Sequence, residues 1–176
     1  GAVALVVLTL VDFLRAEPID QHLPLRQQLD EYLRFLESLE RPDQRFYRQY
    51  LLSSGEGWGE SSPYFDGEIL LALVKAARYL QHEDLRALIL RAADASYAAH
   101  AREAIEQRRD DEDTKGYFQW ACMAFVELYA AQWPDTQRYA QRAIDLAHWM
   151  IDVHRTLDRP FNTGYAYEGI VSAFCL

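Results

Sequence analysis

The chain has 176 residues, enough for one domain with a substantial hydrophobic core. Half of the residues are hydrophobic, 26% are charged, and the net charge is −9. A protein that binds a nucleic-acid backbone needs a basic patch, and none is visible, so we expect no nucleic acid as partner. The opening run GAVALVVLTL is too short to span a bilayer and is soon followed by Asp12, which predicts a buried helix and no membrane contact.

Apolar and amphipathic helices are expected to alternate along the chain. The spacing of apolar residues predicts helices at 2–15, 23–39, 66–80, 84–107, 116–132 and 136–154, with a last one from 164. The second helix should bury a leucine stripe, and the fourth and sixth should bury one face each. A long Gly- and Trp-containing connection before Tyr64 is expected to hold a short β-hairpin near 46–52. Such long connections are often functional.

The apolar helices share features that recur along the chain. A glycine is expected to open each of them, at Gly1, Gly67, Gly116 and Gly164. Ala72, Ala124 and Ala173 recur at a spacing of about 50 residues, the length of one helix pair that stacks on its neighbours. We therefore expect one all-α domain over 1–176, made of antiparallel helical hairpins with apolar inner and amphipathic outer helices. Because the chain stops within an apolar run, we expect a fragment of a larger assembly or one half of a homodimer.

Three segments resemble successive inner-helix starts of the six-hairpin glycosidase-like superfamily: SSPYFDGEILLALVKAARYL, DTKGYFQWACMAFVELYAAQ and FNTGYAYEGIVSAF. The resemblance implies an incomplete α/α toroid, about half of the usual six hairpins. It also implies a saccharide ligand in the mouth of the toroid, where the inner helices begin. The positions it implies for the site are Trp58, Tyr64, Asp66, Glu68, Tyr117, Gln119, Trp120, Tyr165, Tyr167 and Glu168.

Glycoside hydrolysis uses two carboxylates that flank the scissile bond, and Glu68 and Glu168 occupy corresponding places in two repeats. We expect a glycoside hydrolase-like enzyme with these two as catalytic residues, and a helix N-terminus that lowers the pKa of Glu68. Asp66 and Gln119 would bind hydroxyls, while Trp58, Trp120 and the tyrosines at 64, 117, 165 and 167 would contact the sugar. A structural interpretation competes: the acids would cap helices and the rings would fill the core.

Two other functions stay open. One is a sugar epimerase or isomerase of the N-acylglucosamine 2-epimerase type. Its family members use inner-helix histidines, whereas all five histidines here are expected in outer helices or turns. The other is a non-enzymatic α-solenoid that binds a protein on its concave face. No metal or cofactor is expected, because Cys122 and Cys175 lack the spacing of a zinc site and are interpreted as core residues.

Overall fold

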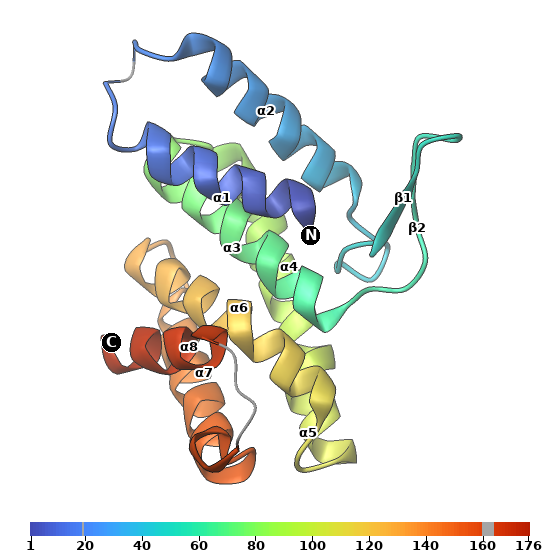
Figure 1. The fold of residues 1–176 in the computed structure, drawn as a ribbon, viewed down its shortest axis with the longest axis vertical. Coiled ribbons are helices and arrows are strands. Elements are labelled where there is room, and N and C mark those ends of the chain that lie inside the picture. Colours follow the sequence, from blue (N-terminus) through green and yellow to red (C-terminus); the bar gives the residue numbers. More distant parts are fainter. Residues whose placement is uncertain (19, 160–163) are drawn as a thin grey trace.

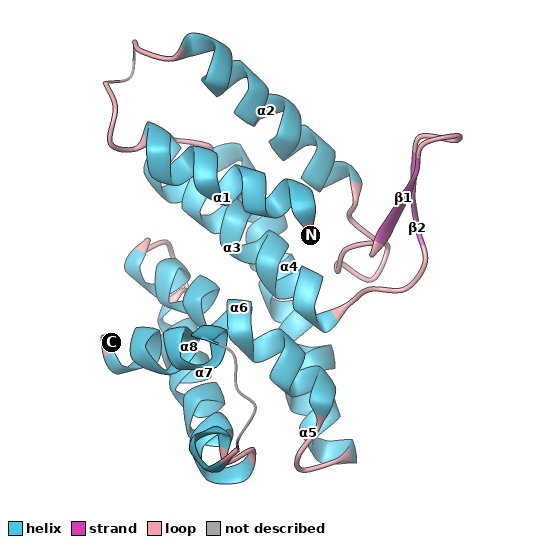
Figure 2. Cartoon of the chain, viewed as in Figure 1, coloured by secondary structure: helices cyan, strands magenta, loops and turns pink. Residues whose placement is uncertain are grey.

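The computed structural model describes residues 1–18, 20–159 and 164–176, and helices account for most of them (Figure 1, Figure 2). The α-helices are α1 (Ala2–Leu14), α2 (Leu23–Ser38), α3 (Pro63–Leu80), α4 (Arg86–Tyr97), α5 (Ala104–Gln107), α6 (Glu112–Ala130), α7 (Gln137–His148) and α8 (Gly164–Phe174). Short 3₁₀ turns are η1 (Glu83–Leu85) and η4 (Thr156–Asp158), and π-helical segments are η2 (Ala98–Glu103) and η3 (Trp149–Val153). The strands β1 (Gln49–Leu51) and β2 (Glu56–Trp58) form an antiparallel hairpin.

Four helices form a row in which each packs against the next: α1, α3, α6 and α8 (Figure 1). We call them the row helices. The flanking helices α2, α4 and α7 pack on α1, α3 and α6 respectively, so each hairpin joins one row helix to one flanking helix. The row helices α1, α3 and α6 begin at the same end, because Gly1 lies against the Phe65 ring and Gly116 lies beside Pro63. The first turn of α8 lies beside Trp120, the ninth residue of α6. The predicted all-α class is confirmed.

The central row helix α3 is buried on almost every side. Every residue from Asp66 to Val74 is buried, and so are Ala76 and Ala77. Because α3 packs against α1, α4 and α6, a helix with no polar face suits its position. Gly67 allows α6 to approach closely: a Cβ there would lie 3.0 Å from Trp120 Cβ and 3.0 Å from the Ala121 nitrogen.

The flanking helices bury most of the stripes that the sequence predicts, whereas Leu25 and Ile151, at the ends of two predicted stripes, are half-buried. The buried positions are Leu29, Leu33, Leu36 and Leu39 in and after α2, Leu85, Leu88, Ile89, Ala92 and Ser96 in and before α4, and Tyr139, Ala143, Leu146, Ala147 and Met150 in and after α7. Neither α4 nor α7 stays α-helical to its predicted end. Each continues into a π-helical segment, η2 or η3, which the apolar pattern did not indicate.

The starts of α3 and α6 differ from the prediction. The first begins at Pro63, since proline is favoured in the first turn of a helix. The second follows Asp111, whose side chain accepts a hydrogen bond from the Asp113 N–H. Gly67 and Gly116 are therefore each the fifth residue of their helix, and the prediction that they open these helices is wrong.

The two ends of the row are less buried than predicted. On α1, Ala4, Val7, Val11 and Leu14 are buried, whereas Leu5, Val6 and Phe13 are exposed. None of the described helices combines the length and the apolar composition that a bilayer crossing requires. Cys122 is buried as predicted, but Cys175 is exposed and is not a core residue.

Candidate functional site

Three rings that were predicted to contact a saccharide meet where the first turns of α3 and α8 lie against the third turn of α6. The Tyr64 and Trp120 ring centroids are 5.7 Å apart in edge-to-face geometry, and those of Trp120 and Tyr165 are 5.0 Å apart. We call these residues the aromatic cluster. Trp120 is buried, Tyr64 is half-buried, and Tyr165 is 39% exposed. The cluster thus reaches from the core to the surface at one end of the row.

Glu68 lies on the face of α3 beside the aromatic cluster. Burial is the main cause that raises the pKa of Tyr64, and the charge of Glu68 adds to this rise. Glu68 is only 1% exposed. Its Oε2 makes no hydrogen bond within the described residues, and the Gly1 amino group lies 3.8 Å from it. A buried carboxyl oxygen with unused hydrogen-bonding capacity is costly, so this position invites a functional explanation.

The pKa of Glu68 is raised, not lowered as the sequence predicted. Burial raises it, and the charge of the Gly1 ammonium group opposes the rise. The prediction is wrong because α3 begins at Pro63, which places Glu68 beyond the first turn, where the helix dipole has faded. Desolvation of the charged form then dominates. A carboxyl group with a raised pKa suits a proton donor better than a nucleophile.

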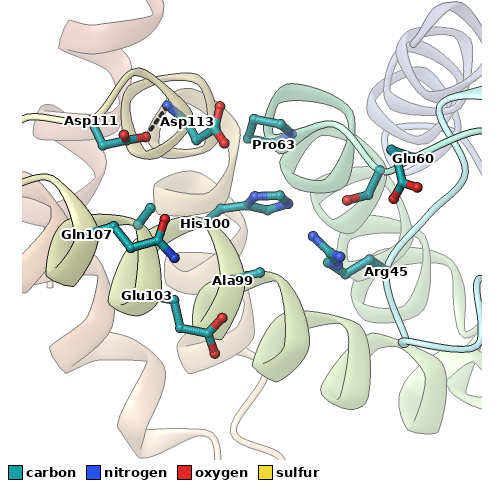
Figure 3. A pocket seen from close by; sticks show the side chains of 11 residues that line it. Arg45, Glu60, Pro63, Ala99, His100, Glu103, Gln107, Asp111 and Asp113 are labelled. Atoms are coloured by element: carbon teal, nitrogen blue, oxygen red, sulfur yellow. Dashed lines mark hydrogen bonds between the residues drawn. The ribbon is translucent and has the colours of Figure 1, made fainter.

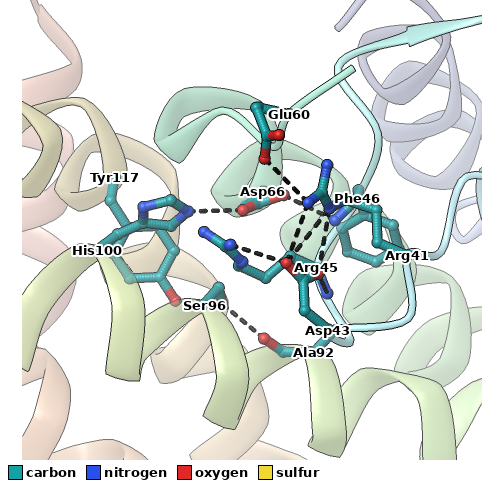
Figure 4. Close-up of polar contacts among 10 residues, drawn as sticks. All are labelled: Arg41, Asp43, Arg45, Phe46, Glu60, Asp66, Ala92, Ser96, His100 and Tyr117. Carbon is teal, nitrogen blue, oxygen red and sulfur yellow. Dashed lines mark hydrogen bonds and ion pairs between the residues drawn. The ribbon is translucent and has the colours of Figure 1, made fainter. Parts of the chain in front are cut away.

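Asp66 points to the other side of α3, because residues two apart lie about 200° apart around a helix. Its Oδ1 accepts a hydrogen bond from the Phe46 N–H at 3.0 Å, and its Oδ2 lies 2.6 Å from His100 Nε2 (Figure 4). Burial raises the pKa of Asp66, and the hydrogen bond and charge of His100 oppose the rise. Both oxygens of Asp66 therefore have protein partners, and it joins α3 to η2 and to the loop before β1.

Tyr117 lies behind His100 and belongs to the core. The two ring centroids are 5.4 Å apart, and the Tyr117 hydroxyl lies 2.8 Å from Ser96 Oγ (Figure 4). Ser96 in turn donates to the Ala92 carbonyl oxygen at 2.6 Å. Tyr117 is fully buried, and burial raises the pKa of its hydroxyl. The Tyr117 ring therefore packs against the His100 ring.

Two hollows open on the His100 side of α3. The first, the His100 hollow, has a volume of about 300 Å³ and is lined by Arg45, Glu60, Ser61, Pro63, Ala99, His100, Glu103, Ala104, Gln107, Asp111 and Asp113 (Figure 3). The second, the Trp58 hollow, has a volume of about 510 Å³ and is lined by Arg41, Pro42, Asp43, Tyr47, Gly57, Trp58, Gly59 and Glu60. Glu60 lines both hollows, so they adjoin.

An ion-pair network stands between the two hollows. Arg41 contacts Asp43 at 3.2 Å and Glu60 at 3.0 Å, and Arg45 contacts Asp43 at 2.8 Å (Figure 4). Burial alone would raise the pKa of Asp43, but the hydrogen bonds from both arginines lower it to about 2. The network holds the loop before β1 against the segment that leads into α3.

The remaining predicted residues lie apart from these groups. Gln119 is buried within α6. Tyr167 and Glu168 are exposed on α8, and the Glu168 side chain makes no hydrogen bond or ion pair with any described residue. The structure therefore brings together Tyr64, Trp120 and Tyr165, with Glu68 beside them. It shows no contact between Glu68 and Glu168 among the described residues.

His100 is the main residue that the sequence analysis missed. It lies in the outer layer, as expected of the histidines, yet it reaches the start of a row helix. A signal was present, because His100 comes four residues after Ser96 and so continues the buried stripe of α4. His154 continues the stripe of α7 in the same way, and its Nδ1 lies 2.7 Å from Asp110 Oδ1. Each buried stripe thus ends on a histidine that pairs with an aspartate.

The described residues contain no group of three or more His, Cys, Asp or Glu side chains arranged to hold a metal ion. No family model, curated protein or solved structure matches the chain.

Proposed function

We propose that the chain is a carbohydrate-active protein, glycoside hydrolase-like in its chemistry, that binds a saccharide at the aromatic cluster, where the first turns of α3 and α8 lie against α6. The observation that carries this proposal is the buried carboxyl group of Glu68 beside the aromatic cluster, with one oxygen that no hydrogen bond occupies. Sugars present apolar C–H faces and many hydroxyls. Rings and a carboxyl group at one place offer partners for both.

The arrangement of the row supports an incomplete α/α toroid as the finer architecture. Each row helix packs on the next, and α1, α3 and α6 begin at one end. In this proposal the row is the inner layer and the flanking helices are the outer layer. The remaining hairpins would come from further chain or from a second copy.

Glu68 would act as the general acid. Its raised pKa favours the protonated form, which can give its proton to the glycosidic oxygen as the bond to the anomeric carbon breaks. Glu168 would be the second carboxylate. It would either remove a proton from the attacking water or attack the anomeric carbon itself, which are the inverting and the retaining routes.

A sugar epimerase or isomerase is the second candidate, and His100 is the observation that favours it. Such enzymes move a proton to and from carbon, a task that an imidazole held by a buried carboxylate can perform. The outer-layer position of His100 does not prevent this role, since its ring reaches Asp66 at the start of α3.

A thermal-shift screen with neutral and uronic-acid saccharides, followed by calorimetric titration, tests the proposal. We expect one sugar class to stabilise the protein, by about 2.7 kcal/mol when the ligand is at 100 times its Kd. Glu68→Gln should keep the fold and abolish hydrolysis of that sugar, as should Glu168→Gln. A cooperative fold that no saccharide stabilises would overturn the proposal and favour the protein-binding solenoid. Turnover retained by Glu68→Gln would remove this residue from the mechanism.

A further inference from the structure

The His100 hollow contains an imidazole that is fixed on one side and unused on the other. Its ring lines the hollow, although His100 is only 5% exposed (Figure 3). Nε2 is engaged by Asp66 at 2.6 Å, and Nδ1 makes no hydrogen bond to any residue that the structure describes. When Asp66 is ionised and the His100 ring is neutral, the proton lies on Nε2, and Nδ1 is then an acceptor. A ligand hydroxyl is the natural donor to such an atom.

The adjoining Trp58 hollow contains an exposed aromatic platform. Trp58 lies on β2 and is 58% exposed. Its ring is a large exposed apolar surface for a hairpin of two short strands. The hairpin is held by pairing of Gln49 with Trp58 and of Leu51 with Glu56. An exposed ring beside a hollow with carboxylate and guanidinium groups is a suitable surface for the C–H face of a sugar.

The charges around the His100 hollow select the kind of ligand. Its lining has four carboxylates, Glu60, Glu103, Asp111 and Asp113, against one guanidinium group, that of Arg45. Arg45 is paired with Asp43, and three of the carboxylates also have arginine partners: Arg41 for Glu60, Arg102 for Glu103 and Arg108 for Asp111. Asp113 has no ion-pair partner among the described residues, so the excess charge at the hollow is negative. Like charges at an interface are unfavourable, so the hollow should disfavour anionic ligands such as uronic acids.

We propose that the two hollows form one groove for an uncharged saccharide chain of at least two units. One unit stacks on Trp58, the next lies in the His100 hollow, and Nδ1 of His100 accepts a hydrogen bond from one of its hydroxyls. Glu60, which lines both hollows, is the boundary between the two units. This inference rests on the proposed function and deepens it, because it names the class of saccharide and a second contact surface on the other face of α3.

Calorimetric titration with uncharged saccharides of one to four units, and with uronic-acid chains of the same lengths, tests the groove. The variants are Trp58→Ala and His100→Gln. Leu52→Ala, in the same hairpin and 92% exposed, is the control for the first. His82→Gln is the control for the second: this histidine lies in the turn between α3 and η1, is half-buried, and its Nε2 lies 3.6 Å from Asp30. Trp58→Ala changes an exposed residue, so it remains informative if His100→Gln fails to fold.

We expect chains of two or more units to bind on the order of 10-fold more tightly than single sugars, and uronic-acid chains to bind more weakly. Trp58→Ala should remove the gain with length, and His100→Gln should weaken binding at every length by on the order of 10-fold. Affinity that does not depend on length, tight binding of uronic acids, or variants that match their controls would each overturn the groove. If Glu68→Gln still abolishes turnover in that case, the proposed function stands without it. If no saccharide of any length binds, both proposals fall.

Discussion

Asp66 and Glu68 are equally buried near the start of one helix, yet their surroundings differ. Asp66 has a partner for each oxygen, the Phe46 N–H and the His100 ring. Glu68 has an oxygen with no hydrogen bond and lies beside three aromatic rings of the row. Burial raises the pKa of both carboxyl groups. Burial is therefore the same for the two acids, whereas their partners differ: two hydrogen bonds for Asp66, and for Glu68 only the Gly1 ammonium group at 3.8 Å.

The largest expected effect is from Asp66→Ala. The change leaves the His100 ring and the Phe46 N–H without their buried acceptor, and breaking a buried pair in this way costs about 3–5 kcal/mol. Urea unfolding should show the loss as a lower midpoint. A loss below about 1 kcal/mol would mean that Asp66, like Glu68, has little structural role, and the contrast between them would disappear.

Gly67 lies between the two carboxyl groups, and Gly67→Ala should have the next largest effect. The new Cβ would lie 3.0 Å from Trp120 Cβ and the Ala121 nitrogen, so α6 must shift. Overpacking costs about 1–3 kcal/mol, and the better helix propensity of alanine returns up to about 1 kcal/mol. We expect a net loss of about 1–2 kcal/mol in urea unfolding.

Gly116→Ala is the matched control, at the same position of α6. Its Cβ would meet Pro63 at an ordinary 3.7 Å, so the propensity gain should make this variant more stable. Equal effects of the two substitutions would contradict the close contact between α3 and α6.

Tyr117→Phe tests the support behind His100. It removes the hydrogen bond to Ser96 but leaves the ring and the bond from Ser96 to Ala92 in place. We expect a loss of about 1 kcal/mol in urea unfolding, the usual contribution of one hydrogen bond. A much larger loss would show that the Asp66 side of α3 depends on the whole chain of hydrogen bonds from Ala92 to Tyr117.

The smallest effect is expected from Glu68→Gln, and it should appear as a change in pH dependence. The pKa of Glu68 is higher in the folded protein than in the unfolded chain, where it is near 4.5. The wild type should therefore lose stability as the pH rises from about 4.5 through the raised folded pKa. When both are unfolded in urea between pH 4 and 7, the glutamine variant should show a smaller decline, because it keeps the contribution of Asp66 and loses that of Glu68. Parallel profiles would show that Glu68 is ionised at no cost and is not a proton donor.

Much of the fold could be predicted from the spacing of apolar residues. The stripe from Leu85 to Ser96 and the one from Tyr139 to Met150 are buried as predicted, because a 3.6-residue period directly records which face meets the core. Helix starts were less predictable. Local backbone preferences at Pro63 and Asp111 determine where α3 and α6 begin. The recurring glycines predicted later starts.

The candidate site could be predicted only in part. The sequence repeat indicated Tyr64, Trp120 and Tyr165, and the structure brings them together because the first turns of α3 and α8 lie against the third turn of α6. The separation of Asp66 from Glu68 follows from helix geometry once α3 is assigned. The direction in which the pKa of each carboxyl group shifts depends on tertiary packing. The contact between Asp66 and His100 depends also on the π-helical geometry of η2, which the sequence pattern does not indicate.

The π-helical segment η2 has a consequence for the register of the chain. A π-helical turn accommodates one more residue than an α-helical turn. If one residue were deleted from the stretch before His100, the helix could continue as a regular α-helix, with little change in length. The residues after η2 would keep their direction, whereas His100, which lies within the π-helical segment, would be turned around the helix axis and shifted relative to Asp66. One surplus residue therefore sets the direction in which this imidazole faces, and a deletion that spares every residue of the site would still dismantle it.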